Sequence, residues 1–309
     1  MRKVVVIGGG TGSYTVLRGL KKYPLQLFSI VNMFDSGGST GILRDELGVL
    51  PPGDVRRCLL ALSSDDEKSE ILRDLFQFRF EGGVNNHSLG NLILTASEKN
   101  YGNIAEGIKK LSKLLGLEGE VIPVSLENAQ LCAKLADGQI IYGESKIDIP
   151  ETERGQISEV YLDPKPTLNE EAKEAMLKAD LIVIGPGDLY TSLIPNLLVE
   201  GVTETLLETK AKIVYVCNLM TKKGETDGFI ASKFLSEIEN YVQKKVDYVI
   251  CNEANINRNS LEHYRKEGQY PVVFDLAQDE RAILANLTSI KGLIRHDGKK
   301  LARELVRLC

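Results

Sequence analysis

The 309-residue chain lacks the features that define several protein classes. No apolar stretch approaches the roughly 18 residues that span a bilayer, and the apolar run after Met1 to Lys3 is too short for a secretion signal. The 38 basic and 43 acidic residues give a net charge of −5 and form no polybasic segment, which argues against nucleic acid as a partner. We therefore expect a cytoplasmic protein without a membrane segment.

Cysteine and histidine are too few and too scattered for a metal centre. The five cysteines include no Cys-x-x-Cys pair, which argues against a disulfide framework and a thiolate zinc site. The three histidines, His87, His263 and His296, have no partner at ligand spacing. We expect reduced thiols, with Cys217 and Cys251 buried inside apolar runs.

Short apolar runs rich in β-branched residues recur along the chain. They occupy residues 4–7, 27–31, 181–184, 213–216, 246–250 and 272–274. Parallel strands are covered on both faces and read as such continuous runs, and helical periodicity in residues 13–22, 66–78 and 228–243 separates several of them. The pattern predicts an α/β fold, a Rossmann-like three-layer αβα sandwich with a mostly parallel sheet and a ligand crevice at the carboxyl ends of its strands.

A different pattern interrupts the repeat between about residues 120 and 162. Alternating stretches at 130–135 and 139–142 flank an Asp137-Gly138 turn, which predicts a β-hairpin. No linker or internal repeat marks a boundary. We therefore expect one domain, residues 1–309, with a small β-rich insertion.

The first glycine loop follows directly after the first predicted strand. It contains Gly8, Gly9, Gly10, Thr11 and Gly12, and glycines followed by a helix N-terminus let backbone N–H groups bind a phosphate. The alternative is a tight turn without a ligand. The spacing fails the dinucleotide fingerprint, because the third glycine would fall on Ser13 or Thr15, and this argues against NAD.

The second predicted strand leads to Asp35, Ser39 and Thr40. Asp35 could bind a ribose or sugar hydroxyl, hold Mg²⁺, or cap the next turn. Three arginines follow in helical segments, and because arginine suits bidentate contact with phosphate we expect one to point inward: Arg44, Arg56 and Arg57.

Two further polar loops precede helices. The first lies at residues 82–91. Its His87 is either a hydrogen-bonded structural residue or a catalyst, and its Asn91 could orient a substrate. In the other, Gly185 and Gly187 follow a buried strand and repeat the logic of the first glycine loop. Loops after parallel strands of one sheet emerge at the same edge, so the two glycine loops can face one crevice, as a diphosphate-linked ligand requires. A loop at 223–228 lies at the same edge and could instead cap a helix.

Together these motifs resemble the YvcK/CofD family over essentially the whole chain. The matching segments are 8–12, 35–41, 51–56, 87–91, 185–192 and 224–228. The resemblance is closest to the YvcK branch, called gluconeogenesis factors, and less close to the 2-phospho-L-lactate transferases of cofactor F420 synthesis.

That resemblance implies a Rossmann-like fold, binding of UDP-N-acetylglucosamine, and a role in cell-wall precursor supply and cell shape on gluconeogenic carbon sources. It implies that the two glycine loops hold the nucleotide phosphates and that Asn196, Tyr264 and Arg295 contact the ligand. The sequence departs from the family pattern at Ser36, where an Asp is usual, and at Asp188, where Ser is common. The first departure weakens the case for Mg²⁺-assisted transfer, and the second alters the charge beside a phosphate loop.

Our leading hypothesis is a nucleotide-sugar-binding regulator without turnover, which acts through a partner protein and forms a homodimer. The alternative is a transferase that moves a phosphate-containing group from a nucleoside-diphosphate carrier, with Asp35 holding Mg²⁺ and Asp35 and His87 as catalytic candidates. An NAD-dependent oxidoreductase is a third hypothesis, which the glycine spacing disfavours.

Overall fold

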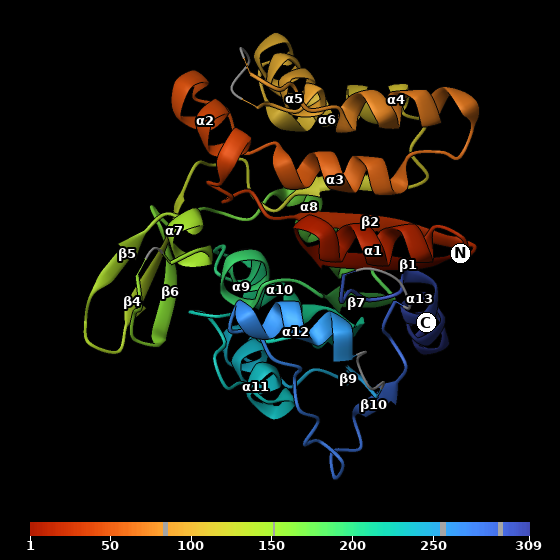
Figure 1. Ribbon diagram of the computed structural model, residues 1–309. Helices are drawn as coiled ribbons and strands as arrows, with labels where there is room; N and C mark the ends of the chain where they lie inside the picture. Colours follow the sequence, from red (N-terminus) through yellow and green to blue (C-terminus); the bar gives the residue numbers. More distant parts are fainter. Residues whose placement is uncertain (83–85, 151, 254–257, 290–292) are drawn as a thin grey trace.

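The computed structural model describes residues 1–82, 86–150, 152–253, 258–289 and 293–309. In these residues a parallel sheet of seven strands runs in the order β10-β9-β8-β7-β1-β2-β3 (Figure 1). The strands are β1 (Arg2–Gly8), β2 (Leu25–Val31), β3 (Glu120–Pro123), β7 (Leu181–Ile184), β8 (Lys212–Val216), β9 (Tyr248–Asn252) and β10 (Ala282–Ala285). The Rossmann-like α/β prediction is confirmed.

The centre of this sheet is where the strand order reverses. β1 pairs with β2 on one side and with β7 on the other, and the apolar side chains of β1 and β7 are buried completely or almost completely. Burial on both faces explains why the two strands read as continuous apolar runs. A sheet whose order reverses opens a crevice at the carboxyl ends of the two diverging strands, and both glycine loops begin there.

Helices cover both faces of the sheet. One layer contains α3, α1 and α13, with α1 packed against each of the other two, and a second contains α8 to α11 (Figure 1). The helices are α1 (Gly10–Leu20), α2 (Gly38–Leu47), α3 (Gly53–Leu62), α4 (Glu67–Gln77), α5 (Leu89–Tyr101), α6 (Ile104–Leu114), α7 (Glu144–Asp148), α8 (Glu170–Leu177), the π-helical turn η1 (Leu189–Leu193), α9 (Ile194–Leu197), α10 (Val202–Glu208), α11 (Ala231–Val242), α12 (Arg258–Lys266) and α13 (Gly298–Leu308).

The predicted hairpin belongs to a small antiparallel sheet. Within the described residues this sheet has three strands, β4 (Gln130–Leu135), β5 (Ile140–Tyr142) and β6 (Ile157–Asp163), in the order β5-β4-β6. It stands at one end of the main sheet, on the left in Figure 1, far from the marked chain ends. Helix α7 follows β5 and contacts η1, which begins directly after the loop of Gly185 and Gly187, called the third loop below.

Three strand assignments differ from the sequence prediction. Residues 272–274 form no strand, because they lie in a loop where Val273 is 61% exposed. The edge strand is instead β10, a short alanine-containing segment whose apolar pattern is weak. β3 pairs with β2 in the main sheet, so residues 120–123 are not part of the insertion where the prediction put them.

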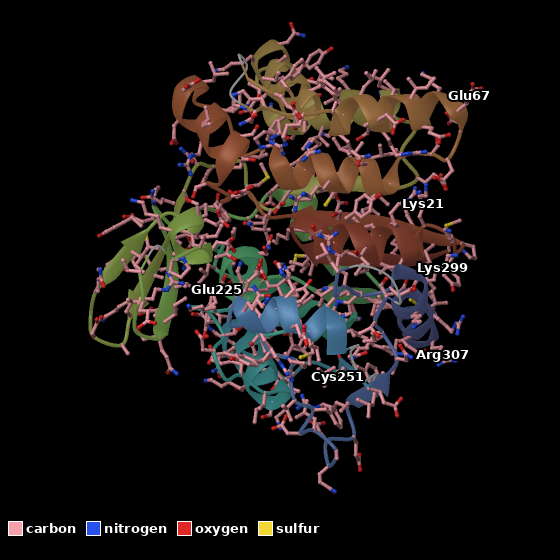
Figure 2. All side chains as sticks on the ribbon, in the orientation of Figure 1. Lys21, Glu67, Glu225, Cys251, Lys299 and Arg307 are labelled. Atoms are coloured by element: carbon pink, nitrogen blue, oxygen red, sulfur yellow. The ribbon has the colours of Figure 1, made fainter. Side chains whose placement is uncertain are left out.

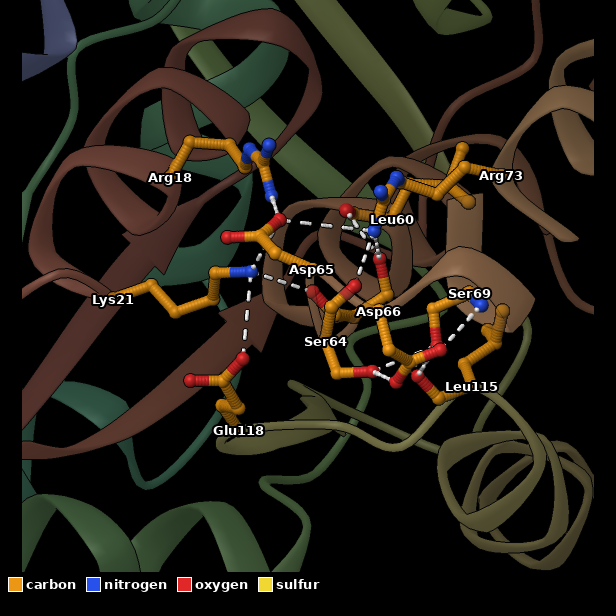
Figure 3. A network of polar contacts seen from close by, with 11 residues as sticks. Arg18, Lys21, Leu60, Ser64, Asp65, Asp66, Ser69, Arg73, Leu115 and Glu118 are labelled. Carbon is orange, nitrogen blue, oxygen red and sulfur yellow. Dashed lines mark hydrogen bonds and ion pairs between the residues drawn. The ribbon is translucent and has the colours of Figure 1, made fainter. Parts of the chain in front are cut away.

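A polar network fastens the end of the sheet opposite the glycine loops (Figure 3). Lys21, just after α1, has a side chain only 2% exposed; its Nζ donates to the carbonyl oxygen of Ser63 at 2.6 Å and pairs with Asp65 at 3.1 Å and Glu118 at 3.6 Å. The hydrogen bond from Arg18, followed by that from Lys21, lowers the pKa of Asp65 to about 2. The network joins α1 to the connection between α3 and α4.

All five cysteines lie in the described residues as free thiols, and Cys217 and Cys251 are buried as predicted. Among the helices described here, none is both long and apolar enough to cross a membrane.

Candidate functional site

Two adjoining cavities lie at the carboxyl ends of the central strands. Cavity A, about 320 Å³, extends from the glycine loops toward α12 and the segment before α13. Cavity B, about 530 Å³, extends toward α2, α3 and α7. Both cavities are lined by Thr11, Gly12, Gly187 and Asp188, so the two glycine loops face one crevice as expected. A ligand lying across these loops would reach into both cavities.

The first glycine loop is shaped by two close approaches. A Cβ atom on Gly12 would lie 1.8 Å from the carbonyl oxygen of Pro186 in the third loop, and one on Gly9 would lie 2.1 Å from Oδ2 of Asp54. Asp54, the second residue of α3, accepts a hydrogen bond from the backbone N–H of Gly10, where α1 begins. The two glycines therefore leave room for the backbone of the third loop and for the carboxylate of Asp54. At the start of α1, which was predicted to bind phosphate, the N–H group of Gly10 already donates to Asp54.

Asp188 in the third loop is paired with a lysine. Lys222 Nζ lies 2.9 Å from Asp188, 3.0 Å from Glu225, and also pairs with Asp148 of α7. Burial disfavours the charged lysine, but Glu225 and the two aspartates outweigh it and raise its pKa. Lys222 thus balances the negative charge of Asp188 beside the loop. The same lysine connects α7 to the third loop, because it also pairs with Asp148.

Glu225, labelled in Figure 2, is the most buried carboxylate of the cluster that Lys222 holds together. Its side chain is fully buried, and burial, opposed by the attraction of Lys222, raises the pKa of Glu225 to about 8. Lys222 is the group that favours the ionised form of Glu225, so its removal would raise the pKa of Glu225 further.

Five carboxylates line cavity B. Asp148 and Asp188 pair with Lys222, and the other three are Asp35, Asp54 and Glu144. Asp35 Oδ1 accepts the N–H of Gly37 at 2.8 Å, and Glu144 Oε2 accepts the N–H of Ser36 at 3.1 Å. Burial and then Asp35 raise the pKa of Asp54 to about 7 and that of Glu144 to about 9. Asp35 therefore does not stand alone, although an Asp is missing at position 36.

The Ser36 substitution has a structural counterpart. Ser36 Oγ accepts the backbone N–H of Ser145 at 3.0 Å, which fixes α7 and its Glu144 at the edge of cavity B. Glu144 therefore brings a carboxylate next to Ser36 from α7, the helix that follows β5.

A chain of hydrogen bonds forms the wall of cavity B. Arg56 Nε donates to Asn91 Oδ1 at 2.8 Å, Asn91 Nδ2 donates to Ser39 Oγ at 3.0 Å, and Ser39 Oγ lies 2.8 Å from His87 Nδ1. Asn91 and Ser39 line the cavity, but His87 is buried behind Ser39 and lines neither cavity. This geometry gives His87 a positioning role toward Ser39.

Two of the three predicted arginines reach cavity B, where we expected one. Arg56 and Arg57 line it, and Arg57 Nη1 donates to Thr11 Oγ1 at 3.3 Å. Arg44 pairs with Asp45 at 2.8 Å and lies outside the lining. Arg79, which follows α4, also lines cavity B and was not anticipated.

Cavity A contains two of the three positions that the family resemblance suggested. Tyr264 and Arg295 line it, and Tyr264 Oη accepts the N–H of Ile294 at 3.1 Å, which joins α12 to the segment carrying Arg295. Asn196 lies on α9 outside both linings, with its Nδ2 donating to the carbonyl oxygen of Ser192 at 2.8 Å. Gly8 and Gly185 also lie outside the linings and shape the backbone of their loops.

Sequence reasoning missed Asp54, Glu144, Lys222 and Arg79. Asp54 stands in the Pro51 to Arg56 segment, which was noted for its resemblance only, and the other three are single charged residues without a local motif. Across the described ranges, no group of three or more His, Cys, Asp or Glu side chains is arranged to hold a metal ion.

Comparison with known proteins places these features in context. A family model described as 2-phospho-L-lactate transferase CofD matches residues 4–289. The gluconeogenesis factor of Halalkalibacterium halodurans is 45% identical over 278 residues, covering 89% of this chain and 84% of that protein. The gluconeogenesis factor of Bacillus subtilis is 39% identical over 320 residues, covering 99% and 98%. A crystal structure of a Bacillus halodurans protein superposes with a TM-score of 0.93 at 40% identity and covers 99% of both chains.

Proposed function

The chain belongs to the CofD family, in its YvcK or gluconeogenesis-factor branch, and from this premise we propose that it is a regulatory protein that binds a nucleotide sugar, UDP-N-acetylglucosamine. The observation that carries the proposal is the pair of cavities meeting at the two glycine loops. The nucleoside lies in cavity A beside Tyr264 and Arg295. The diphosphate lies across the loops, and the sugar lies in cavity B.

The chemistry of the linings supports this arrangement. Backbone N–H groups of Thr11 and Gly12 stand at the start of α1, whose dipole favours an anion. Tyr264 offers an aromatic ring on which a base can stack, and Arg295 offers donors to a ribose or phosphate oxygen. The two volumes fall in the range of small-molecule sites, roughly 300–1,000 Å³.

Calorimetric titration with UDP-N-acetylglucosamine, UDP, GDP and NAD, with and without Mg²⁺, tests the proposal. We expect binding of the UDP sugar without product, no binding of NAD, and loss of affinity in Tyr264→Ala and Arg295→Ala. Arg265→Ala is the matched control, because Arg265 is exposed on the same helix as Tyr264 and lies outside cavity A. Undiminished affinity in both cavity A variants would refute the placement.

A transferase is the second candidate, and Asp54 favours it. Its pKa of about 7 suits a general base at neutral pH. The carboxylate oxygens of Asp35 suit Mg²⁺, which when bound would offset the charge of a diphosphate. Release of nucleotide from a nucleoside-diphosphate-linked donor, dependent on Mg²⁺ and abolished by Asp54→Asn, would establish this activity and overturn the regulator.

The wider role follows from the family. We propose that the protein acts in the cytoplasm as a homodimer, and that a partner protein reads its ligand state to adjust cell-wall precursor supply and cell shape on gluconeogenic carbon sources. Light scattering with and without ligand tests the dimer. Growth and cell shape of a deletion strain on such carbon sources test the role.

A further inference from the structure

Three arginines line cavity B without an ion-pair partner in the described part of the chain. They are Arg56 and Arg57 on α3 and Arg79 after α4, and no carboxylate oxygen lies within 4.0 Å of any of them. By contrast, Arg44 and Arg281 each pair with a carboxylate at 2.8 Å or less. None of the three guanidinium groups makes an ion pair at that distance with a described residue, although the charge of Asp54 acts on Arg56 and Arg57. An anion in the cavity would therefore meet guanidinium donors that no described carboxylate occupies.

The most buried member is the best fixed. Arg56 is 9% exposed and donates to Asn91 and, at 3.5 Å, to the carbonyl oxygen of Phe76. Burial, followed by the charges of Arg57 and Arg79, lowers its pKa to about 10. For all three arginines, the Nη2 group has no acceptor among the described residues, so each retains a free donor.

The start of α2 adds backbone donors to the same wall. Its N-cap, Gly37, provides no side-chain cap, and the N–H groups of Gly38 and Ser39 have no acceptor in the described residues. Both residues line cavity B, and Asn91 joins Ser39 to Arg56 by two hydrogen bonds. The first turn of this ten-residue helix therefore stands beside the buried guanidinium group.

We propose that cavity B contains a second anion site, formed by Arg56, Arg79 and the first turn of α2, which binds the phosphate group of a small phosphate monoester. Planar guanidinium forks and helix N–H groups match a dianionic phosphate with several acceptor oxygens. The proposal rests on the proposed function in assigning the nucleotide diphosphate to the glycine loops and in placing the sugar in cavity B beside the phosphate site, not on it. A protein with both sites would respond to a nucleotide sugar and to a phosphorylated metabolite together.

The carboxylates of cavity B set the conditions for this site. Asp35 lies close to the start of α2, Asp54 lies by the first glycine loop, and Glu144 faces Asp35. The remaining two carboxylates, Asp148 and Asp188, are paired with Lys222, away from the arginines.

The test is titration with inorganic phosphate at constant ionic strength, followed by ³¹P NMR and calorimetry, with and without saturating UDP-N-acetylglucosamine. We expect phosphate to bind in both states. Because one charge-assisted contact contributes about tenfold or more in affinity, Arg56→Gln and Arg79→Gln should each weaken phosphate binding by at least that factor. Arg44→Gln, on the neighbouring α2, should bind phosphate as the wild type does.

Three results would overturn the proposal. They are the absence of phosphate binding, wild-type affinity in Arg79→Gln, and complete displacement of phosphate by the UDP sugar, which would assign the arginines to the diphosphate or the sugar of that ligand. Arg79 is exposed, so its variant remains informative if Arg56→Gln does not fold. Phosphate titration of the free protein and its variants needs no nucleotide, so it can succeed or fail independently of the proposed function.

Discussion

Replacing Asp54 with asparagine should stabilise the protein at alkaline pH. Asparagine keeps an oxygen that can accept the N–H of Gly10 but carries no charge. Asp54 is 7% exposed, and its pKa of about 7 lies above the ordinary 3.8 because of burial and then Asp35. A folded-state pKa above the unfolded value means that the folded protein binds the proton more tightly. The corresponding stability is present below pH 3.8 and is lost as the pH rises through 7.

The size of the effect follows from the two pKa values. Ionising Asp54 in the folded protein costs about 4 kcal/mol, from a rise of about 3 pH units at roughly 1.4 kcal/mol each. Coupling to Asp35 shares this cost between two groups, so we expect a change on the order of 2–4 kcal/mol. Glu144, with its pKa of about 9, adds a further decline that both proteins share.

Urea unfolding followed by circular dichroism, from about pH 4 to about pH 9, measures the difference in unfolding free energy between Asp54→Asn and the wild type. We expect that difference to grow in favour of the variant across this range. Asp137→Asn is the control, because Asp137 is exposed in the hairpin turn, where its Oδ1 accepts the N–H of Gln139 at 2.9 Å. If the Asp54→Asn difference does not change with pH, Asp54 is not a buried, uncompensated carboxylate.

Three further predictions follow from the same contacts. Lys222→Met should reduce the unfolding free energy by about 3–5 kcal/mol, since it leaves Glu225 buried without its partner, and Glu225→Gln in the same chain should restore part of the loss in urea titration. Gly12→Ala should cost about 1–3 kcal/mol or more, because its Cβ meets a carbonyl group of the third loop; Gly155→Ala, with open space around it, should be neutral in thermal melts. In the native protein a thiol reagent should react rapidly with Cys309 alone, since the other four cysteines are buried, and with all five after denaturation; several fast native thiols would contradict the burial.

The core of the fold was predictable because its signal is local. Residues 4–7 and 181–184 are continuous apolar segments, since strands at the centre of a parallel sheet are buried on both faces. Edge strands carry no such signal. β10 has a partly exposed face with Leu284 at 41%, and an apolar triplet at 272–274 that looks like a strand serves instead as part of a loop.

The candidate site was predictable where a local pattern marks it, most clearly at the glycine loops. Gly12 and Gly187 lie in two loops whose backbones approach closely, so a residue without a side chain is needed at Gly12 and the sequence itself shows this. Asp54 and Glu144 reach cavity B because α3 packs on α1 and α7 packs beside Ser36. Those contacts join segments distant in sequence, and no spacing rule within either segment reveals them.

The position of β1 at the centre of the sheet has a consequence for synthesis of the chain. β1 and β2 leave the ribosome early, whereas β7 emerges only after the whole antiparallel sheet has been translated. During that interval one edge of β1 presents unpaired backbone groups beside apolar side chains, a template for association with other chains. Chains that stop before β7 should therefore aggregate, and the nascent protein needs protection until its middle section has been translated.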